Sequence, residues 1–346
     1  MTGYKRVLID RFGGPELLHV VEEPALPEPG AGEVRLRIVA SGVGYTDTIV
    51  RRGKYVEYRG GVPMTPGYDV VGTVDAVGDG VGLKLGTMVA DMTITGGYAQ
   101  YLIRPAAGLV PVPAGVNPTQ AVCVPLIWMT AWQMLTRYRT PAVGETILVV
   151  GAAGSTGRAL VALAQHLGLK VVGSCSSHDM DAVRESGAAP VDYRTPDLPD
   201  AIRRAARSRP ITMAFDAAAG KSWESSWVVL ARGGVLVSYG AESFLDEGAS
   251  LAATALQFTR LMLVWNLKGR LDGTGRRAVM YNINARRKKH GGHYREDAAH
   301  LLGLIATTAV SPAVEMVLPL SGAAEAHRRI DRGGMSGRIV LDPWMP

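Results

Sequence analysis

The chain has 346 residues, of which 47% are hydrophobic and 6% aromatic, and this length and composition favour two domains with α/β packing. Its net charge of +6 is spread along the chain, apart from a basic run at 286–289 that we expect to form a solvated turn. This charge favours a polyanionic cofactor over nucleic acid as a partner. Two cysteines, Cys123 and Cys175, exclude a disulfide framework, and no segment resembles a signal peptide or membrane anchor, so we expect a cytoplasmic protein.

The first part of the chain, 1–127, consists of short strand-like runs separated by turns rich in glycine and proline. Residues 34–39 alternate polar and apolar side chains, as a half-buried antiparallel strand does. This pattern predicts a mostly β domain.

The middle part, 128–292, alternates continuous apolar strands with helices. We expect a helix from Ala159 to Leu167 and strands at 146–150, 170–173, 190–193, 212–216, 234–238 and 277–281. Strands that are apolar along their whole length belong in a parallel sheet that helices cover on both faces. The order of elements therefore predicts a doubly wound Rossmann domain. Its last strand, 277–283, is expected at an exposed, apolar sheet edge, which favours a homodimer formed through that edge.

The last part, 293–346, returns to mixed patterning, with helices expected at 295–307 and 323–332 and strands at 314–318 and 338–341. We expect this tail to pack on the N-terminal β domain, so that the Rossmann domain is inserted between two pieces of a catalytic domain. His300 and His327 are on the two predicted helices and are expected at the surface.

A glycine-rich turn, Gly151 to Gly157, lies between the first strand of the middle part and the following helix. In this context Gly154 allows the backbone to approach a pyrophosphate, and Gly157 allows the helix to pack on the strand. The helix N-terminus offers free N–H groups and a positive dipole end. The turn therefore predicts a dinucleotide site.

At the end of the second strand, 173–178, there is no Asp or Glu to hold a ribose 2′-hydroxyl. Ser174, Ser176 and His178 offer hydrogen bonds and partial charge to a 2′-phosphate instead. We therefore expect NADPH to be preferred over NADH. The alternative for His178 is a solvent-facing residue in the first turn of the next helix.

Several short motifs accompany the glycine loop, at 12–18, 42–47, 52–55, 66–69, 192–194 and 337–341. Together they resemble the medium-chain dehydrogenase/reductase superfamily, and within it the zinc-free quinone oxidoreductase branch related to zeta-crystallin. The resemblance implies that the β domain is GroES-like. Where zinc members carry Cys and a His-Glu pair, this chain has Gly44 and Tyr68-Asp69, so we expect no catalytic zinc.

The resemblance also implies a set of site residues. Arg338 is expected near the cofactor phosphates, and the other cofactor contacts are Thr130, Ala153, Gly154, Ser155, Thr156, Gly157, Ser176, His178, Tyr193, Ser238, Tyr239 and Gly240. A cleft between the domains is expected to hold the substrate, lined by Gly44, Tyr45, Tyr55, Trp128, Tyr239 and Trp265. Tyr45 and Tyr55 are the candidate catalytic proton donors, and Asp47 is expected to order its loop.

Two departures from the family matter. It usually has Asn at the position of Gly44, so we expect an enlarged pocket there. It usually has Lys at the position of His178, so the preference for NADPH could be blunted.

The expected reaction is direct hydride transfer from NADPH to a quinone or to the conjugated double bond of an enone, by proximity and a hydroxyl donor. One alternative is an enoyl-thioester reductase whose basic stretch, 276–289, contacts a carrier. Another is a cofactor-binding protein with a non-redox role, which Gly44 motivates. The substrate, the pathway and the oligomeric state are left open.

Overall fold

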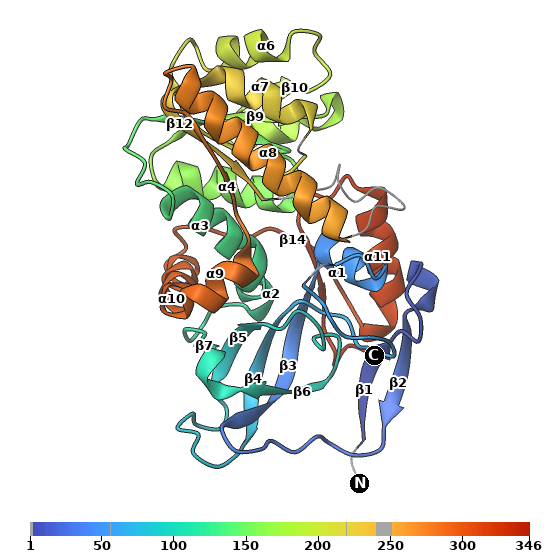
Figure 1. The fold of residues 1–346 in the computed structure, drawn as a ribbon. Coiled ribbons are helices and arrows are strands. Elements are labelled where there is room, and N and C mark those ends of the chain that lie inside the picture. Colours follow the sequence, from blue (N-terminus) through green and yellow to red (C-terminus); the bar gives the residue numbers. More distant parts are fainter. Residues whose placement is uncertain (1–2, 56, 219, 240–250) are drawn as a thin grey trace. The chain divides into compact units, whose positions relative to one another are not determined.

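The computed structural model describes residues 3–55, 57–218, 220–239 and 251–346. The chain forms two compact units (Figure 1). The flanking unit contains Met1–Met129 and Asn284–Pro346, and the central unit contains Thr130–Ile283. The sequence pattern predicts these divisions after residues 127 and 292.

The flanking unit is built around a mostly antiparallel sheet with the strand order β14-β15-β3-β4-β5-β7, in which β6 also pairs with β3. Its long central strand, β3, alternates buried and half-buried residues, as the sequence pattern predicts. Strands β1 and β2 pair separately. The strands are β1 Tyr4–Leu8, β2 His19–Glu23, β3 Glu33–Val43, β4 Asp69–Val77, β5 Met88–Met92, β6 Tyr101–Pro105, β7 Val110–Pro111, β14 Val314–Leu318 and β15 Arg338–Leu341.

The C-terminal tail completes this sheet. Strand β15 pairs antiparallel with β3 and parallel with β14, which confirms that the tail packs on the N-terminal part of the chain. The helices of the flanking unit are α1 Tyr45–Arg51, α2 Pro118–Ala121, η3 Val124–Trp128, α9 Ile283–Lys289, α10 Gly291–Ala306 and α11 Ala323–Arg332.

The central unit has a six-stranded parallel sheet with the order β10-β9-β8-β11-β12-β13. The chain moves outward from β8 in one direction and from β11 in the other, so the switch point lies between these two strands. The strands are β8 Thr146–Val150, β9 Lys170–Cys175, β10 Ala189–Asp192, β11 Ile211–Asp216, β12 Leu230–Ser238 and β13 Arg277–Met280, and the helices are α3 Met129–Thr136, α4 Ser155–His166, α5 Met180–Glu185, α6 Leu198–Ala205, α7 Lys221–Val229 and α8 Leu251–Leu271. The predicted Rossmann fold is confirmed.

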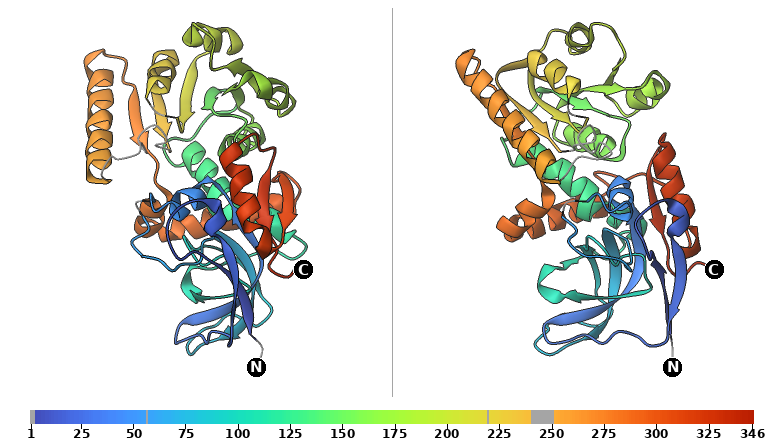
Figure 2. Two further views of the ribbon diagram at one scale, coloured as in Figure 1. Left: turned by 90° about the vertical axis from the view of Figure 1, so that its right-hand side faces the viewer. Right: turned by 45° about the vertical axis from the view of Figure 1, so that its right-hand side comes forward.

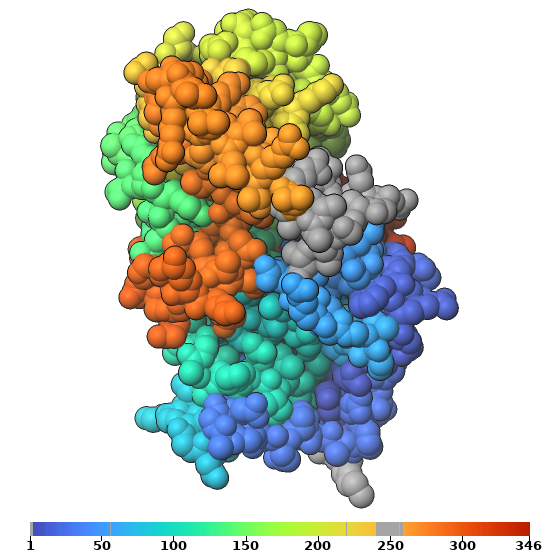
Figure 3. Space-filling view, in the orientation of Figure 1, coloured from blue at the N-terminus to red at the C-terminus, as the bar shows by residue number. Residues whose placement is uncertain are grey.

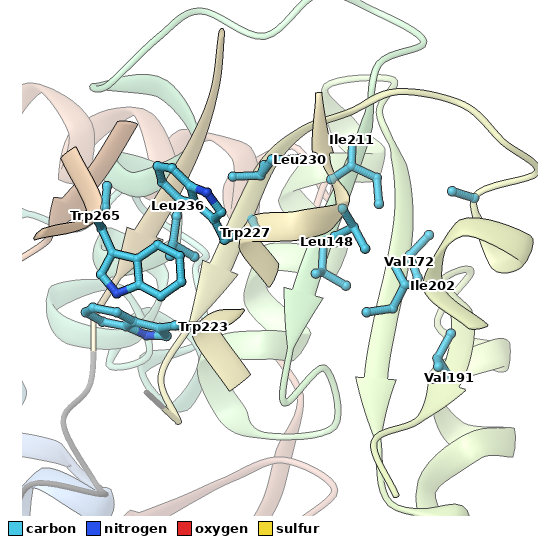
Figure 4. Packing of buried hydrophobic residues seen from close by; sticks show 14 residues of the cluster. Leu148, Val172, Val191, Ile202, Ile211, Trp223, Trp227, Leu230, Leu236 and Trp265 are labelled. Atoms are coloured by element: carbon cyan, nitrogen blue, oxygen red, sulfur yellow. The ribbon is translucent and has the colours of Figure 1, made fainter. Parts of the chain in front are cut away.

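The core of the central unit contains three tryptophans, Trp223, Trp227 and Trp265, which lie together near Leu236 (Figure 4). The ring centroids of Trp227 and Trp265 are 5.0 Å apart. Only 7% of Trp265 is exposed. The side chain packs α8 against α7 in the core, and its expected role in a substrate pocket stays a prediction.

The edge strand β13 is less open than the sequence suggests. Helix α8 runs beside it (Figure 2), and the side-chain amide of Asn266 donates to the backbone oxygen of Ala278 (2.8 Å) and accepts from its backbone N–H (3.2 Å). The Asn266 side chain therefore satisfies the backbone N–H and oxygen of Ala278, with which an added strand would otherwise form hydrogen bonds.

Two other expectations are corrected. The basic run at 286–289 belongs to helix α9 and not to a turn, and Arg287 from this run is turned inward to Asp91 and the backbone oxygen of Met92. His327 is fully buried on α11, whereas His300 on α10 is exposed as expected.

None of the described helices is long and apolar enough to span a membrane.

Candidate functional site

The glycine loop of the central unit connects the end of β8 with the start of α4, next to the switch point of the sheet. Gly151 adopts a positive φ of 73°, and its N–H and that of Ala152 both donate to the backbone oxygen of Ser174 on β9. The loop is thus tied to the neighbouring strand. Arg158 on α4 donates from Nε to the backbone oxygen of Ala153 (2.7 Å), which fixes the entry into the helix.

The two glycines that the sequence analysis distinguished have different surroundings. A Cβ at Gly157 would lie 2.2 Å from the backbone oxygen of Gly151, so only glycine lets α4 pack this closely, as predicted. A Cβ at Gly154 would meet only that same oxygen, at an ordinary 3.4 Å. Gly154, the N-cap residue, is exposed. The fold itself therefore leaves its outer side free for a ligand, beside Ser155 and Thr156 at the positive end of a twelve-residue helix.

The segment after β9 contains an acid, Asp179, that was not expected from the sequence pattern. The hydroxyl of Ser176 donates to Asp179 Oδ2 (2.7 Å). Asp179 closes the short helix η4, Ser177–Asp179, in which His178 is exposed. The spacing of three residues between a Ser and a following acid is a local signal for such a contact. The Ser176 hydroxyl, which we expected to bind a 2′-phosphate, is therefore already hydrogen-bonded to the carboxylate of Asp179.

Tyr193 and Arg194 follow the neighbouring strand β10. Tyr193 is 48% exposed, and its N–H donates to the backbone oxygen of Cys175 at the end of β9. The guanidinium of Arg194 lies 5.4 Å from the centre of the Tyr193 ring. The same edge of the sheet therefore carries an exposed aromatic ring and a cation next to Ser176.

The C-terminal ends of β11 and β12 lie on the same side of the sheet as the C-terminal ends of β9 and β10. Asp216 is fully buried at the end of β11 and accepts from Ser222 Oγ (2.7 Å), Ser226 Oγ (3.0 Å) and the N–H of Ala218 (2.9 Å). Sequence reasoning missed Asp216, because these partners lie on the following loop and helix. Ser238 is buried at the end of β12, Tyr239 is half-buried, and Gly240 lies outside the described residues.

In the flanking unit, the loop before α1 contains Gly44, whose N–H donates to Asp47 Oδ2 (2.9 Å). This bond confirms that Asp47 orders its loop. Burial, together with the neighbouring charge of Asp69, raises the pKa of Asp47 to about 7.

Arg338 occupies the space beside Gly44. Its Nη2 donates to both carboxylate oxygens of Asp69 (2.7 and 2.8 Å), and a Cβ at position 44 would lie 2.8 Å from its Nη1. A guanidinium thus fills the space that we expected to enlarge a pocket. Only 3% of Arg338 is exposed, and it is held by Asp69, whereas the resemblance implied a place near phosphates. Its Nε and Nη1 have no hydrogen-bond partner among the described residues.

The candidate donors Tyr45 and Tyr55 differ in their surroundings. Tyr45 is 41% exposed at the start of α1. Tyr55 is half-buried, and its hydroxyl lies 2.6 Å from the hydroxyl of Tyr68 and 2.8 Å from Asn284 Nδ2. Sequence reasoning missed Asn284, which lies on α9, far away along the chain. Trp128 and Thr130, two other expected site residues, are 5% and 8% exposed.

A second buried polar group, His327, anchors α11 to α1 and to the loop before β6. His327 Nδ1 accepts from Arg51 Nη1 (3.2 Å), and its Nε2 lies 3.1 Å from the hydroxyl of Tyr98. Burial, with the charges of Arg51 and Arg52, lowers the pKa of His327 to about 3. The imidazole is therefore neutral and serves packing.

No group of three His, Cys, Asp or Glu side chains in the described part of the chain could hold a metal ion. The position next to Asp69 that carries His in zinc members holds Tyr68, whose pKa is raised by burial. A buried phenol of this kind is a poor metal ligand.

Comparison with protein families gives two matches. Residues 30–114 match the alcohol dehydrogenase GroES-like domain, and residues 187–341 match the zinc-binding dehydrogenase family. The two matched segments cover parts of both units and include β3, α1 and β15.

Several characterised proteins are similar over most of the chain. A quinone oxidoreductase from Rattus norvegicus is 29% identical over 71% of this chain and 76% of its own length. The solved structure of a mycobacterial quinone oxidoreductase is 26% identical, covers 98% of this chain and 100% of its own, and has a TM-score of 0.82. The Escherichia coli quinone oxidoreductase complexed with NADPH is 24% identical over 98% of this chain and 100% of its own, with a TM-score of 0.83; this last likeness shows a shared fold.

Proposed function

Because the chain belongs to the medium-chain dehydrogenase/reductase superfamily, in the branch of the quinone oxidoreductases, we propose that it is an NADPH-dependent oxidoreductase that reduces a quinone or the conjugated double bond of an enone. The observation that carries the proposal is the glycine loop. Gly157 is required by the packing of α4, whereas the outer side of Gly154 is open at the N-terminus of that helix. This is the arrangement that a pyrophosphate needs.

The central unit supplies the residues that would hold the cofactor. The N–H groups at the start of α4 would bind the pyrophosphate, and Ser176, Tyr193 and Arg194 would surround the adenine ribose and its phosphate. When bound, NADPH supplies a hydride from its nicotinamide. The buried Asp216 at the end of β11 accepts from Ser222 and Ser226 on α7, so the start of this helix is tied to the end of the strand.

The flanking unit supplies the candidate proton donors. Reduction of a quinone or enone leaves negative charge on the acceptor oxygen, and a phenol can donate a hydrogen bond and then a proton to it. Tyr45 and Tyr55 both fit this role by chemistry. In the thioester alternative, Arg287 would not be available to a carrier because it pairs with Asp91, whereas Lys288 and Lys289 of the same stretch are exposed.

The test starts with separate titrations of NADPH and NADH, followed by nicotinamide fluorescence. 1,4-Benzoquinone, 9,10-phenanthrenequinone, a simple enone and crotonyl-CoA are then added to the better complex. We expect NADPH to bind and to be oxidised by a quinone or the enone. Gly154→Val should weaken NADPH binding at least about tenfold, or ~1.4 kcal/mol, while the poorer N-cap residue lowers Tm only slightly. If neither nucleotide binds, the proposal fails; binding without oxidation by any acceptor favours a non-redox role.

The cofactor preference gives a separate prediction at Asp179. Its carboxylate opposes a 2′-phosphate, so Asp179→Asn should strengthen NADPH binding about two- to fivefold relative to NADH, as expected for one partly exposed charge. Asp181→Asn is the matched control, because Asp181 is exposed on α5 and pairs with Arg184. Fluorescence titrations of both nucleotides measure the ratio. An unchanged ratio in Asp179→Asn would place the 2′-phosphate away from Ser176.

A further inference from the structure

The hydroxyls of Tyr55 and Tyr68 and the amide nitrogen of Asn284 form a triangle of short contacts inside the flanking unit. The two phenol oxygens are 2.6 Å apart, and Asn284 Nδ2 lies 2.8 Å from each of them. The two rings meet edge to face, with centroids 5.7 Å apart. Tyr55 is half-buried, whereas Tyr68 is fully buried on the loop before β4.

The number of hydrogens in the triangle decides the orientation of the Asn284 amide. If its oxygen faced the phenols, three oxygens would lie within 2.8 Å of one another and share only two phenol protons. One of the oxygen–oxygen contacts would then contain no hydrogen and be repulsive. With the NH₂ group inward, every contact contains a hydrogen, and one phenol proton is left over.

The burial of the two tyrosines decides which of them keeps the free proton. If Tyr55 donated to Tyr68, the remaining proton would be on Tyr68, which is fully buried and has no further acceptor among the described residues. Such a buried, unsatisfied hydroxyl is unfavourable. If Tyr68 donates to Tyr55, the free proton is on Tyr55, whose side chain is partly exposed. The second arrangement is therefore the stable one.

Electrostatics agree with this direction. Burial raises the pKa of Tyr55, and its hydrogen bonds to Tyr68 and Asn284 act in the opposite direction. The pKa of Tyr68 is raised by burial first, and its hydrogen bond to Tyr55 raises it further. Tyr68 is thus the donor of the pair, and Tyr55 is the hydroxyl that accepts two hydrogen bonds.

Helix α9 holds Asn284 in this place. Arg287, one turn further along, donates to Asp91 Oδ1 (2.6 Å), and Arg104 donates to the other oxygen of Asp91 (2.6 Å). Only 2% of Asp91 is exposed. The helix is therefore fastened to β5 and β6 by a buried carboxylate between two arginines, and Asn284 cannot move away from the phenols without breaking these bonds.

We propose that Tyr68 and Asn284 are positioning residues, which hold the Tyr55 hydroxyl with its proton free for the acceptor and stabilise the phenolate that proton transfer leaves. The inference rests on the proposed function. When bound, NADPH would supply the hydride for the new C–H bond at the β-carbon of an enone; the C=C pair would then form the bond from the α-carbon to the carbonyl carbon, and the C=O pair would move to the carbonyl oxygen. That oxygen takes the proton of Tyr55, whose O–H bond breaks, and water then reprotonates the phenolate.

The first experiment measures Tyr55 without cofactor. 3-Fluorotyrosine, whose phenol is more acidic, is incorporated at position 55, and its ionisation is followed by fluorine NMR over a pH titration. Tyr68→Phe and Asn284→Ala each remove one donor to the phenolate, so each should raise the titration midpoint by about one pH unit. Tyr58→Phe is the matched control, because the Tyr58 hydroxyl donates only to the backbone oxygen of Gly61.

A midpoint that stays unchanged or falls in both variants would overturn the inference. If circular dichroism shows that Tyr68→Phe does not fold, the titration midpoint of Asn284→Ala alone decides the test.

The second experiment measures turnover of an enone or quinone. In Tyr68→Phe, kcat should fall about tenfold at neutral pH, with an unchanged KM for NADPH and a pH profile displaced in the same direction as the NMR midpoint. A lower kcat with an undisplaced pH profile would mean that Tyr68 acts only through packing. If the wild-type protein reduces no acceptor, the proposed function fails, whereas the NMR titration still decides whether Tyr68 and Asn284 control Tyr55.

Discussion

Gly44 stands where the resemblance leads us to expect Asn, and Arg338 lies in the space that the Asn side chain would need. Asp69 holds the guanidinium through two hydrogen bonds to Nη2. This arrangement explains the glycine without strain, because φ at Gly44 is −145°, which any residue adopts. A neighbour more than 290 residues away in the sequence therefore decides which side chain position 44 accepts.

A side chain at position 44 should for this reason be destabilising. Gly44→Ala places a Cβ 2.8 Å from Arg338 Nη1, and the buried ion pair cannot shift freely. We expect a loss of about 1–3 kcal/mol in the free energy of unfolding, as for other overpacked cores. Gly82→Ala is the control, because a Cβ there meets nothing within 4 Å. Urea denaturation of the two variants measures the difference, and equal stabilities would contradict this account.

At the scale of elements, α11 is attached to α1 and to the loop before β6 by a neutral histidine. The periodicity of this segment predicts its helix bounds correctly, but it also places His327 at the surface. The helix buries His327 because three partners satisfy the imidazole and its surroundings: Arg51 and Tyr98 contact the ring, and Asp331 pairs with Arg51 at 3.0 Å. Helical periodicity alone does not reveal partners from other elements.

The lowered pKa of His327 makes stability depend on pH. Between about 3 and the ordinary value of 6.5, the unfolded chain binds a proton that the folded chain does not. The contribution is therefore complete above pH 6.5 and is lost as pH falls toward 3. From pH 8 to pH 5 the wild type should lose about 2 kcal/mol more than His327→Gln.

Comparison with the variant is needed because Asp47, with its pKa raised to about 7, acts in the opposite direction. Its contribution is present at low pH and is lost as pH rises through 7. The exposed His300 offers a control: His300→Gln should follow the wild type. Urea denaturation at the two pH values gives these differences, and identical slopes for wild type and His327→Gln would show that the histidine ionises in the folded protein.

For the molecule as a whole, the sequence was sufficient for the features that depend on local pattern. The parallel sheet, the glycine loop and the returning strand β15 were all predictable, since each has its own periodicity or turn signal. The pairs that join distant segments were not, and they include Asp69 with Arg338 and Tyr55 with Asn284. Helix α8 also escaped prediction, because its apolar residues are not confined to one face: Trp265 is buried, whereas Leu263 and Leu267 are 67% and 55% exposed.

This exposed apolar face of α8 changes which surface we expect to form the homodimer: the helix α8 and not the edge strand β13. Asn266 already takes the backbone groups of Ala278 on β13, so a second chain cannot extend the sheet there without displacing it. Helix α8 lies at the surface of the central unit (Figure 3), and Leu256, Val264 and Leu271 are 72%, 53% and 78% exposed. An apolar helix face of this kind marks an interaction surface. We therefore expect two copies to associate through α8.

Light scattering coupled to size-exclusion chromatography tests this expectation. The wild type should have the mass of a dimer at micromolar concentration, and Leu263→Glu combined with Leu267→Glu should have the mass of a monomer, because association would bury the new carboxylates. Val143→Glu is the control, since Val143 is 84% exposed elsewhere in the central unit, and it should remain dimeric. A dimer that survives both glutamates would have to use another surface, and a monomeric wild type would leave the α8 face to a different partner.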